Sequence, residues 1–374
     1  MNIKSIRIER LELKMKEPFE TSFGKEEDKD VIIVTVHTKN GAIGYGECVA
    51  MAAPLYNEET NGTVWHMLQD FLIPAVSAME FNSKSGLMKI RERLHPFKKN
   101  NMAKAALEMA IWDAYANETG VPLVELLGGT RKEIPVGISV GIQPTIDGLV
   151  KKVAGYVDQG FKRIKVKVRP GYDLEPLRAI RKAFPDILLM ADANSAYRLS
   201  DIDRLKQFDE LNLMMIEQPL AHDDIIDHAR LQKELSTSIC LDESIHSAED
   251  VRKAVELSAC RIINLKLGRV GGFGEALLIH ESCQKAGLDL WCGGMLETGI
   301  GRLHNIAITA LPGFTLPGDT APSARYFEED LIDPPVSFSK PGMLQVEPLA
   351  GVASRVKPER IRKWLVKEFV QNFE

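Results

Sequence analysis

The chain has 374 residues and a formal net charge of −5, so it is long enough for two domains and carries no excess of positive charge. It contains no block of lysine and arginine, and we therefore expect no nucleic-acid partner. No run of about 18 apolar residues occurs, which predicts no membrane span. The start is too charged for a signal peptide, and the five cysteines form no CxxC pair. These features are typical of a cytoplasmic protein with reduced thiols.

Residues 1–130 are expected to form an α+β domain. Strand-like alternation runs from Ile6 to Met15, a β-branched run covers Val31–His37, and a third short strand is predicted at Gly44–Glu47. Helical spacing of apolar residues then takes over, most clearly from Ala103 to Ala114. This order predicts a short β meander followed by helices.

Residues 131–320 alternate between short apolar runs and helical or glycine-punctuated stretches. The apolar runs are residues 135–140, 164–168, 187–191, 213–216, 239–241, 262–265, 288–291 and 314–316. Eight such runs in one direction predict a parallel (β/α) barrel. The tail, residues 321–374, is expected to return to the first domain. The predicted fold class is α/β: a modified (β/α) TIM-type barrel with an α+β capping domain built from the N-terminal third and the C-terminal tail.

Charged residues follow the middle runs at a nearly constant interval. Each lies 24 or 25 residues after the one before it: Lys167, Asp192, Glu217, Asp242 and Lys266. One strand and one helix per interval would put all five at the C-terminal ends of consecutive strands. Barrel active sites are built at those ends, so we predict that the five side chains lie together.

The second predicted barrel strand carries cations on one side. Because side chains alternate along a strand, Arg163, Lys165, Lys167 and Arg169 share one face, opposite the apolar Ile164 and its neighbours. The surrounding helices need the apolar face, so we expect the four cations to point into the barrel. Cations inside a barrel need anionic partners, and the next three strands supply carboxylates.

The three carboxylates are hard oxygen ligands with no cysteine or histidine beside them. Asp192, Glu217 and Asp242 therefore predict a Mg²⁺ site, with Mn²⁺ as an alternative occupant. A purely structural network of salt bridges remains the competing interpretation. A metal ion on a substrate carboxylate, together with a lysine base, suits removal of the proton beside that carboxylate. We expect neighbouring cations, such as Lys165 beside Lys167 and Arg269 beside Lys266, to lower the pKa of the base.

The charged residues stand in short motifs that resemble those of the enolase superfamily, and within it the muconate-lactonizing group. The motifs are Lys165-Val-Lys167, Asp192-Ala-Asn194, Glu217-Gln-Pro219, Asp242-Glu243 and Asn264-Leu-Lys266. Superfamily sites use lysine or histidine bases with magnesium. The resemblance covers the whole chain and implies that Lys167 and Lys266 are catalytic and face each other across the substrate, with the metal on the three acids. The mandelate-racemase branch is disfavoured, because the seventh strand, Leu290–Gly294, offers no histidine.

Two longer motifs, Gly294–Arg302 and Leu316–Asp319, resemble the o-succinylbenzoate synthases, especially those that also racemise N-succinylamino acids. The resemblance implies dehydration of 2-succinyl-6-hydroxy-2,4-cyclohexadiene-1-carboxylate in menaquinone biosynthesis, with racemase activity beside it. A dedicated N-acylamino acid racemase is the main alternative. A dipeptide epimerase fits less well, because only Asp319 stands where those enzymes show an Asp-x-Asp pair. A muconate cycloisomerase and a non-catalytic binding barrel are also less favoured.

The same resemblance implies a small-molecule carboxylate substrate held under two capping loops, Pro18–Gly24 and Ala53–Tyr56. Paired or higher homo-oligomers are common among similar proteins. The residues expected to bind substrate or to support the site are Phe19, Tyr56, Ser139, Lys165, Asn194, Glu243, Asn264, Arg269, Gly294, Met295 and Glu297.

Overall fold

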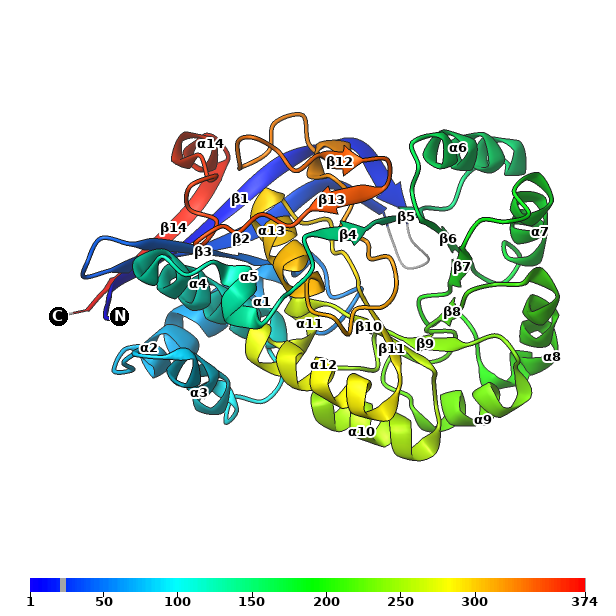
Figure 1. Ribbon diagram of the computed structural model, residues 1–374, viewed down its shortest axis with the longest axis horizontal. Coiled ribbons are helices and arrows are strands. Elements are labelled where there is room, and N and C mark those ends of the chain that lie inside the picture. Colours follow the sequence, from blue (N-terminus) through cyan, green and yellow to red (C-terminus); the bar gives the residue numbers. More distant parts are fainter. Residues whose placement is uncertain (21–24, 374) are drawn as a thin grey trace.

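The computed structural model describes the backbone of residues 1–20 and 25–373 and the side chains of residues 1–18 and 27–373. A curved parallel sheet with helices around its outside lies beside an antiparallel sheet with its own helices (Figure 1). No helix in the described part of the chain is long and apolar enough to cross a membrane.

The antiparallel sheet joins the two ends of the chain. Its strand order is β14-β1-β2-β3. The strands are β1 (Ile3–Glu20), β2 (Lys25–Thr38), β3 (Ile43–Cys48) and β14 (Leu365–Asn372). Strand β14 pairs with β1 from Ser5 opposite Asn372 to Leu11 opposite Leu365, so the tail completes the N-terminal sheet. The division of the chain at residues 130 and 320 stays a prediction.

Helix α4 (Asn101–Thr119) packs directly on this sheet because β3 carries two glycines. A β-carbon on Gly46 would lie 2.0 Å from the Ala106 carbonyl oxygen, and one on Gly44 would lie 2.1 Å from the Ala114 nitrogen. The other helical segments on this side are α1 (Asn61–Met67), the π-helical turn η1 (Leu68–Leu72), α2 (Ile73–Val76), α3 (Lys84–Leu94) and α5 (Leu123–Leu127).

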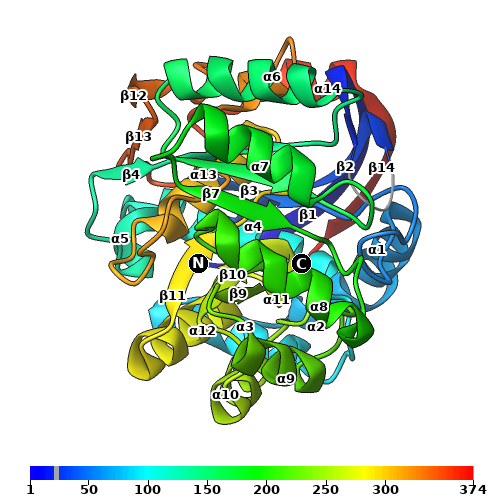
Figure 2. The same cartoon turned by 90° about the vertical axis from the view of Figure 1, so that its right-hand side faces the viewer.

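The parallel sheet has seven strands in the order β11-β10-β9-β8-β7-β6-β5. They are β5 (Gly137–Val140), β6 (Arg163–Lys167), β7 (Leu189–Asp192), β8 (Ile216–Glu217), β9 (Ile239–Leu241), β10 (Ile262–Leu265) and β11 (Asp289–Cys292). Helices α6 to α10 ring its outside (Figure 2). The helical segments are α6 (Ile146–Asp158), α7 (Leu174–Ala183), η2 (Leu199–Asp201), α8 (Ile202–Leu205), η3 (Lys206–Leu211), α9 (Ile226–Glu234), α10 (Ala248–Leu257), α11 (Leu267–Val270), α12 (Phe273–Ala286) and α13 (Gly299–Thr309). The predicted modified barrel with a capping domain is confirmed.

The eighth predicted run, residues 314–316, is not a strand. Isolated parallel bridges join Phe314 to Leu290 and Gly318 to Val136, so this segment closes the gap between β11 and β5. Pro317 lies between the two bridges and has no backbone N–H to donate, which interrupts a regular ladder.

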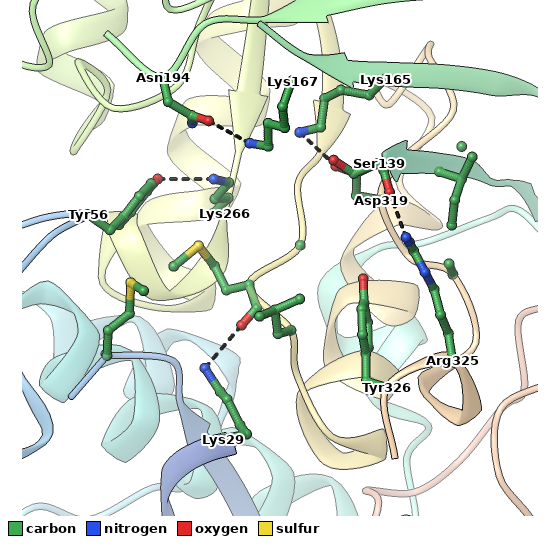
Figure 3. Close-up of a pocket in the computed structure, with 17 residues that line it drawn as sticks. Lys29, Tyr56, Ser139, Lys165, Lys167, Asn194, Lys266, Asp319, Arg325 and Tyr326 are labelled. Carbon is green, nitrogen blue, oxygen red and sulfur yellow. Dashed lines mark hydrogen bonds and ion pairs between the residues drawn. The ribbon is translucent and has the colours of Figure 1, made fainter. Parts of the chain in front are cut away.

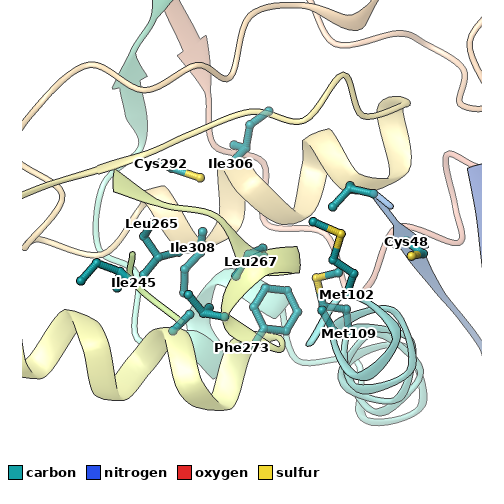
Figure 4. Packing of buried hydrophobic residues seen from close by; sticks show 14 of the residues in the cluster. Cys48, Met102, Met109, Ile245, Leu265, Leu267, Phe273, Cys292, Ile306 and Ile308 are labelled. Carbon is teal, nitrogen blue, oxygen red and sulfur yellow. The ribbon is translucent and has the colours of Figure 1, made fainter. Parts of the chain in front are cut away.

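The remaining elements lie at the edge of the barrel and in the tail. They are β4 (Glu133–Pro135), β12 (Phe338–Lys340) and β13 (Met343–Gln345), which form a three-stranded sheet, and η4 (Ser323–Arg325) and α14 (Pro358–Lys363). One hydrophobic core runs through both parts of the molecule. Figure 4 shows Met102 and Met109 of α4 beside Phe273 of α12, with Leu265 and Cys292 of the barrel strands close by. Helix α4 of the capping domain therefore packs directly against the barrel.

Candidate active site

A cavity lies where the barrel strands end and the capping domain covers them (Figure 3). Its wall combines residues from both parts of the chain. The lining residues are Lys29, Met51, Tyr56, Gly137, Ile138, Ser139, Lys165, Lys167, Asn194, Lys266, Gly294, Met295, Leu296, Asp319, Ala321, Arg325 and Tyr326. Among the predicted site residues, the cavity thus brings together both candidate catalytic lysines with Tyr56, Ser139, Lys165, Asn194, Gly294 and Met295.

Strand β6 carries the first group of charges. Lys167 Nζ donates to Asp192 Oδ2 at 2.6 Å and to Asn194 Oδ1 at 2.7 Å. Lys165 Nζ lies 3.2 Å from Asp192 Oδ2, 3.0 Å from Glu217 Oε2 and 2.8 Å from Asp319 Oδ2. Lys165, Lys167, Asp192 and Glu217 are almost completely buried, whereas Asn194 and Asp319 are partly exposed. Parallel pairing places Lys167 beside Asp192 and Asp192 beside Glu217, as the constant interval in the sequence predicted.

The opposite side of the site is built around Lys266, which directly follows β10. Its Nζ donates to Asp242 Oδ2 at 2.7 Å and to the Tyr56 hydroxyl at 3.1 Å. Arg269 Nη1 also pairs with Asp242 and donates to the Tyr56 hydroxyl at 3.2 Å. Tyr56 comes from the capping domain, so this hydrogen-bonded group spans the two parts of the molecule.

The charge environment raises the pKa of two lysines instead of lowering it. Burial alone would lower the pKa of Lys266, but Tyr56, Glu243 and Glu217 outweigh burial and raise it. Burial opposes the charged form of Lys165 as well, yet Asp319, Glu217 and Asp192 raise its pKa. The pKa of Lys266 is thus raised in this arrangement and not lowered as expected, and the Arg269 guanidinium next to it is paired with Asp242.

The pKa values of two neighbouring carboxylates, Asp192 and Glu217, shift in opposite directions. Burial would raise the pKa of Asp192, but Lys167 and Lys165 lower it below its ordinary value. Glu217 has a raised pKa because it is buried and lies beside Asp192. The Asp192 and Glu217 carboxylates thus share the positive charge of Lys165, which contacts both. Asp192 also pairs with Lys167 at 2.6 Å, so two ammonium groups contact these two carboxylates.

Two further buried oxygens near the acids lack a donor. Glu243 Oε1 accepts from Asn194 Nδ2 at 3.0 Å, but Glu243 Oε2 accepts no hydrogen bond from any described residue. Asn264 Nδ2 donates to Glu217, and Asn264 Oδ1 has no donor. As the side chains stand, no three His, Cys, Asp or Glu groups among the described residues are arranged to hold a metal ion. Lysine ammonium groups bond to the carboxylate oxygens instead.

Several predicted residues lie outside the cavity wall. Asn264, Glu243 and Arg269 are buried beneath it and contact the charged groups. Glu297 accepts from the Met295 N–H at 2.9 Å and lies 3.0 Å from Arg302, so it supports the loop after β11. The Phe19 side chain, with most of the Pro18–Gly24 loop, lies outside the described residues.

One cation predicted to face inward does not. The side chains of Arg163, Lys165 and Lys167 are buried, whereas Arg169 is exposed, because β6 ends at Lys167 and a turn follows. Burial raises the pKa of the Cys292 thiol to about 12, so Cys292 does not supply a thiolate nucleophile.

Sequence reasoning missed four charged or aromatic wall residues: Lys29, Asp319 as a wall group, Arg325 and Tyr326. Asp319 pairs with Arg163 and Lys165, each at 2.8 Å. A signal for Lys29 was present, because it shares the strand face of Val31 and Ile33, which are buried. Lys29 lies within a run of charged residues, which obscured the alternation of buried and exposed positions in the sequence.

The comparison with known proteins agrees with the geometry. The mandelate racemase / muconate lactonizing enzyme N-terminal domain family matches residues 4–128, and the enolase C-terminal domain-like family matches residues 148–360. An o-succinylbenzoate synthase of Geobacillus stearothermophilus is 52% identical over 97% of this chain and 96% of its own. An N-succinylamino acid racemase of Thermus thermophilus is 45% identical over 97% of this chain and 98% of its own.

Solved structures show the same arrangement. A member of the enolase superfamily from Listeria innocua has a TM-score of 0.95 at 40% identity, with 100% of both chains covered. The two families together match most of the chain, and the relatives cover nearly all of it. The chain therefore belongs to the enolase superfamily, and within it to the o-succinylbenzoate synthase / N-succinylamino acid racemase subfamily.

Proposed function

We propose that this protein is an o-succinylbenzoate synthase that also racemises N-succinylamino acids. The observation that carries the proposal is the pair of lysines, Lys167 and Lys266, in the wall of one cavity. They come from β6 and from the end of β10, which three other strands separate in the sheet. Two bases on different sides of a substrate suit an enzyme that moves an α-proton. The synthase and racemase relatives, at 52% and 45% identity, support the same pair of activities.

The residues present fit a divalent metal ion. Asp192, Glu217 and Asp242 supply buried carboxylate oxygens from adjacent strands as possible metal ligands. Nearby, one oxygen each of Glu243 and Asn264 accepts no hydrogen bond from the described residues. Oxygen donors of this kind suit Mg²⁺, and Mn²⁺ can replace it. We propose that the three acids hold the ion. When bound, it would act as a Lewis acid that stabilises negative charge on the substrate carboxylate.

The chain's own groups would carry the proton transfer. Lys167 Nζ would take the α-proton of the synthase substrate. Lys266 would stay protonated and stabilise the enolate, a role that its raised pKa suits. The Tyr56 hydroxyl, bonded to Lys266 Nζ, would hold that ammonium in place. In racemisation Lys266 would have to act as a base toward the second enantiomer, and so would have to lose its proton.

The alternatives fit this site less well. A dipeptide epimerase needs free carboxylates for a substrate ammonium, whereas Asp319 is paired with Arg163 and Lys165. A dedicated N-acylamino acid racemase uses the same groups and stays the second candidate, supported by the Thermus thermophilus racemase. We also propose a small carboxylate substrate, a cytoplasmic location and a homo-oligomer, as the sequence predicts.

The test uses the purified protein with Mg²⁺ and two substrates. Loss of the conjugated diene absorbance of the cyclohexadiene substrate measures dehydration, and polarimetry of N-succinylphenylalanine measures racemisation. We expect both activities. Racemisation without dehydration would leave the dedicated racemase, and neither activity would refute the proposal.

A further inference from the structure

Lys29 lies on β2 of the capping domain, away from the lysines at the barrel strand ends. Figure 3 shows its side chain on the capping side of the cavity, with Lys165 and Lys167 on the barrel side. Its side chain is buried, and only 2% of the residue is exposed. Its Nζ donates to the Met295 carbonyl oxygen at 3.3 Å, in the loop after β11.

The charge of Lys29 has no acidic partner among the side chains that the structure describes. In the described part of the chain, Lys165, Lys167 and Lys266 each form ion pairs with buried carboxylates, whereas Lys29 forms none. A buried ammonium without a counter-charge is costly, and a carbonyl oxygen at 3.3 Å offsets only part of that cost. Burying this cation therefore lowers the stability of the unliganded fold, and a bound ligand that supplies a negative charge would offset that cost.

The rest of the cavity wall explains which ligand would do so. Of the described side chains that line the cavity, five are lysine or arginine and only Asp319 is acidic. That carboxylate is already paired with Arg163 and Lys165. A ligand with one carboxylate would bind beside the lysines at the strand ends, Lys167 and Lys266, and leave Lys29 unpaired. A ligand with two carboxylates would also supply a counter-charge for Lys29.

We propose that Lys29 binds the distal carboxylate of the substrate's succinyl arm and so determines selectivity for dicarboxylates. The proposal rests on the proposed function, which supplies the succinyl group. The first carboxylate would lie at the barrel strand ends and the second against β2. A dicarboxylate would then bridge the capping domain and the barrel, and an ammonium–carboxylate hydrogen bond is among the stronger polar contacts in a protein.

The competing explanation is that Lys29 only fixes the Met295 loop through its hydrogen bond. The two explanations differ in what they predict for a substrate without the distal charge. A binding role affects only the charged arm. A loop role affects every substrate that uses the cavity, because Met295 is part of the wall.

The experiment compares N-succinylphenylalanine with its analogue in which the distal carboxylate is a carboxamide. The proteins are the wild type, Lys29→Met, Lys29→Arg and the control Lys14→Met, which removes an exposed lysine from the neighbouring strand β1. We expect the wild type to favour the succinyl substrate in kcat/KM by about 10- to 100-fold, as for a hydrogen bond to a charged group. Lys29→Met should bring this ratio close to one mainly through KM, and Lys29→Arg should retain most of it.

Calorimetric binding of o-succinylbenzoate and of its distal carboxamide, with Mg²⁺ present, decides the role of Lys29 independently of turnover. Selective loss of affinity for the dicarboxylate in Lys29→Met, with Lys14→Met unchanged, supports the proposal even if the wild type catalyses neither reaction. Equal losses for both ligands, or equal losses for both substrates, would overturn it in favour of the loop role. A wild type that shows no preference for the dicarboxylate would also overturn it.

Discussion

Removing one lysine at a time should separate the two directions of proton transfer. If Lys167 and Lys266 act from different sides, each should abstract the α-proton of one enantiomer of an N-succinylamino acid. Lys167→Ala should stop exchange from one enantiomer and spare the other. Lys266→Ala should show the opposite preference, and both variants should fail to racemise.

The expected size of the effect follows from the contacts. A positioned base contributes about 10²- to 10⁴-fold, so exchange from the affected enantiomer should fall by at least about 100-fold. The fold should survive both changes. Asp242 remains paired with Arg269 when Lys266 is replaced, and Asp192 remains paired with Lys165 when Lys167 is replaced. Because a partner cation remains, the loss of stability should lie near the low end for a broken buried pair, about 3 kcal/mol.

Proton NMR in D₂O, with each enantiomer of N-succinylphenylalanine in a separate tube, measures the exchange. Thermal unfolding of each variant checks that it is folded at the assay temperature. Equal loss of exchange from both enantiomers in each folded variant would refute the assignment of one lysine to each side. Normal dehydration by Lys266→Ala would refute the role of that ammonium in stabilising the enolate.

Three other predictions test different parts of the molecule. Chelation should abolish turnover, and Mg²⁺ or Mn²⁺ should restore it; full activity of a metal-free preparation would contradict the proposed site. Burial raises the pKa of Glu108 to about 8, above its ordinary 4.5. Because the unfolded state releases the proton at lower pH than the native state, this acid makes the native state less stable as pH rises from 4.5 to 8. The melting temperature of Glu108→Gln, relative to that of the wild type, should therefore increase from pH 5 to pH 8. A difference in melting temperature that does not change with pH would contradict this. Gly46→Ala should destabilise the protein by about 3 kcal/mol, because its β-carbon would lie 2.0 Å from the Ala106 carbonyl oxygen. Gly155→Ala in α6, whose β-carbon would have nothing within 4 Å, should stabilise it by about 0.5–1 kcal/mol. Denaturant unfolding measures both changes.

The barrel and its charged strand ends could be predicted because two regular patterns coincide. The interval of 24 or 25 residues between Lys167, Asp192, Glu217, Asp242 and Lys266 reflects one strand and one helix per unit, and the structure places each at or just after a strand end. Strand alternation also placed Lys165 correctly inside. It failed for Arg169, because periodicity does not say where a strand ends.

Long-range contacts could not be predicted in this way. Tyr56 meets Lys266, 210 residues later, and Lys29 meets Met295, 266 residues later. Only the packing of the capping domain on the barrel brings these residues together, and no local pattern encodes it. The expected pKa of Lys266 failed for a related reason. Arg269 is near in sequence and is paired with Asp242, whereas the groups that raise the pKa of Lys266 are Tyr56, Glu243 and Glu217, which lie farther away along the chain.

The raised pKa of Lys266 and its proposed work as a base in racemisation can be reconciled through the acids. Burial is the largest influence on this pKa and lowers it, and Tyr56, Glu243 and Glu217 together reverse its direction. Under the proposed function, a divalent ion held by Asp192, Glu217 and Asp242 would take up much of the negative charge around the lysine. The influence of Glu217 on Lys266 would then weaken, and the positive ion would itself oppose a second positive charge nearby, so Lys266 would give up its proton more readily. The same acids would thus hold the ion and control whether Lys266 is an acid or a base, which links the two reactions through one set of charges.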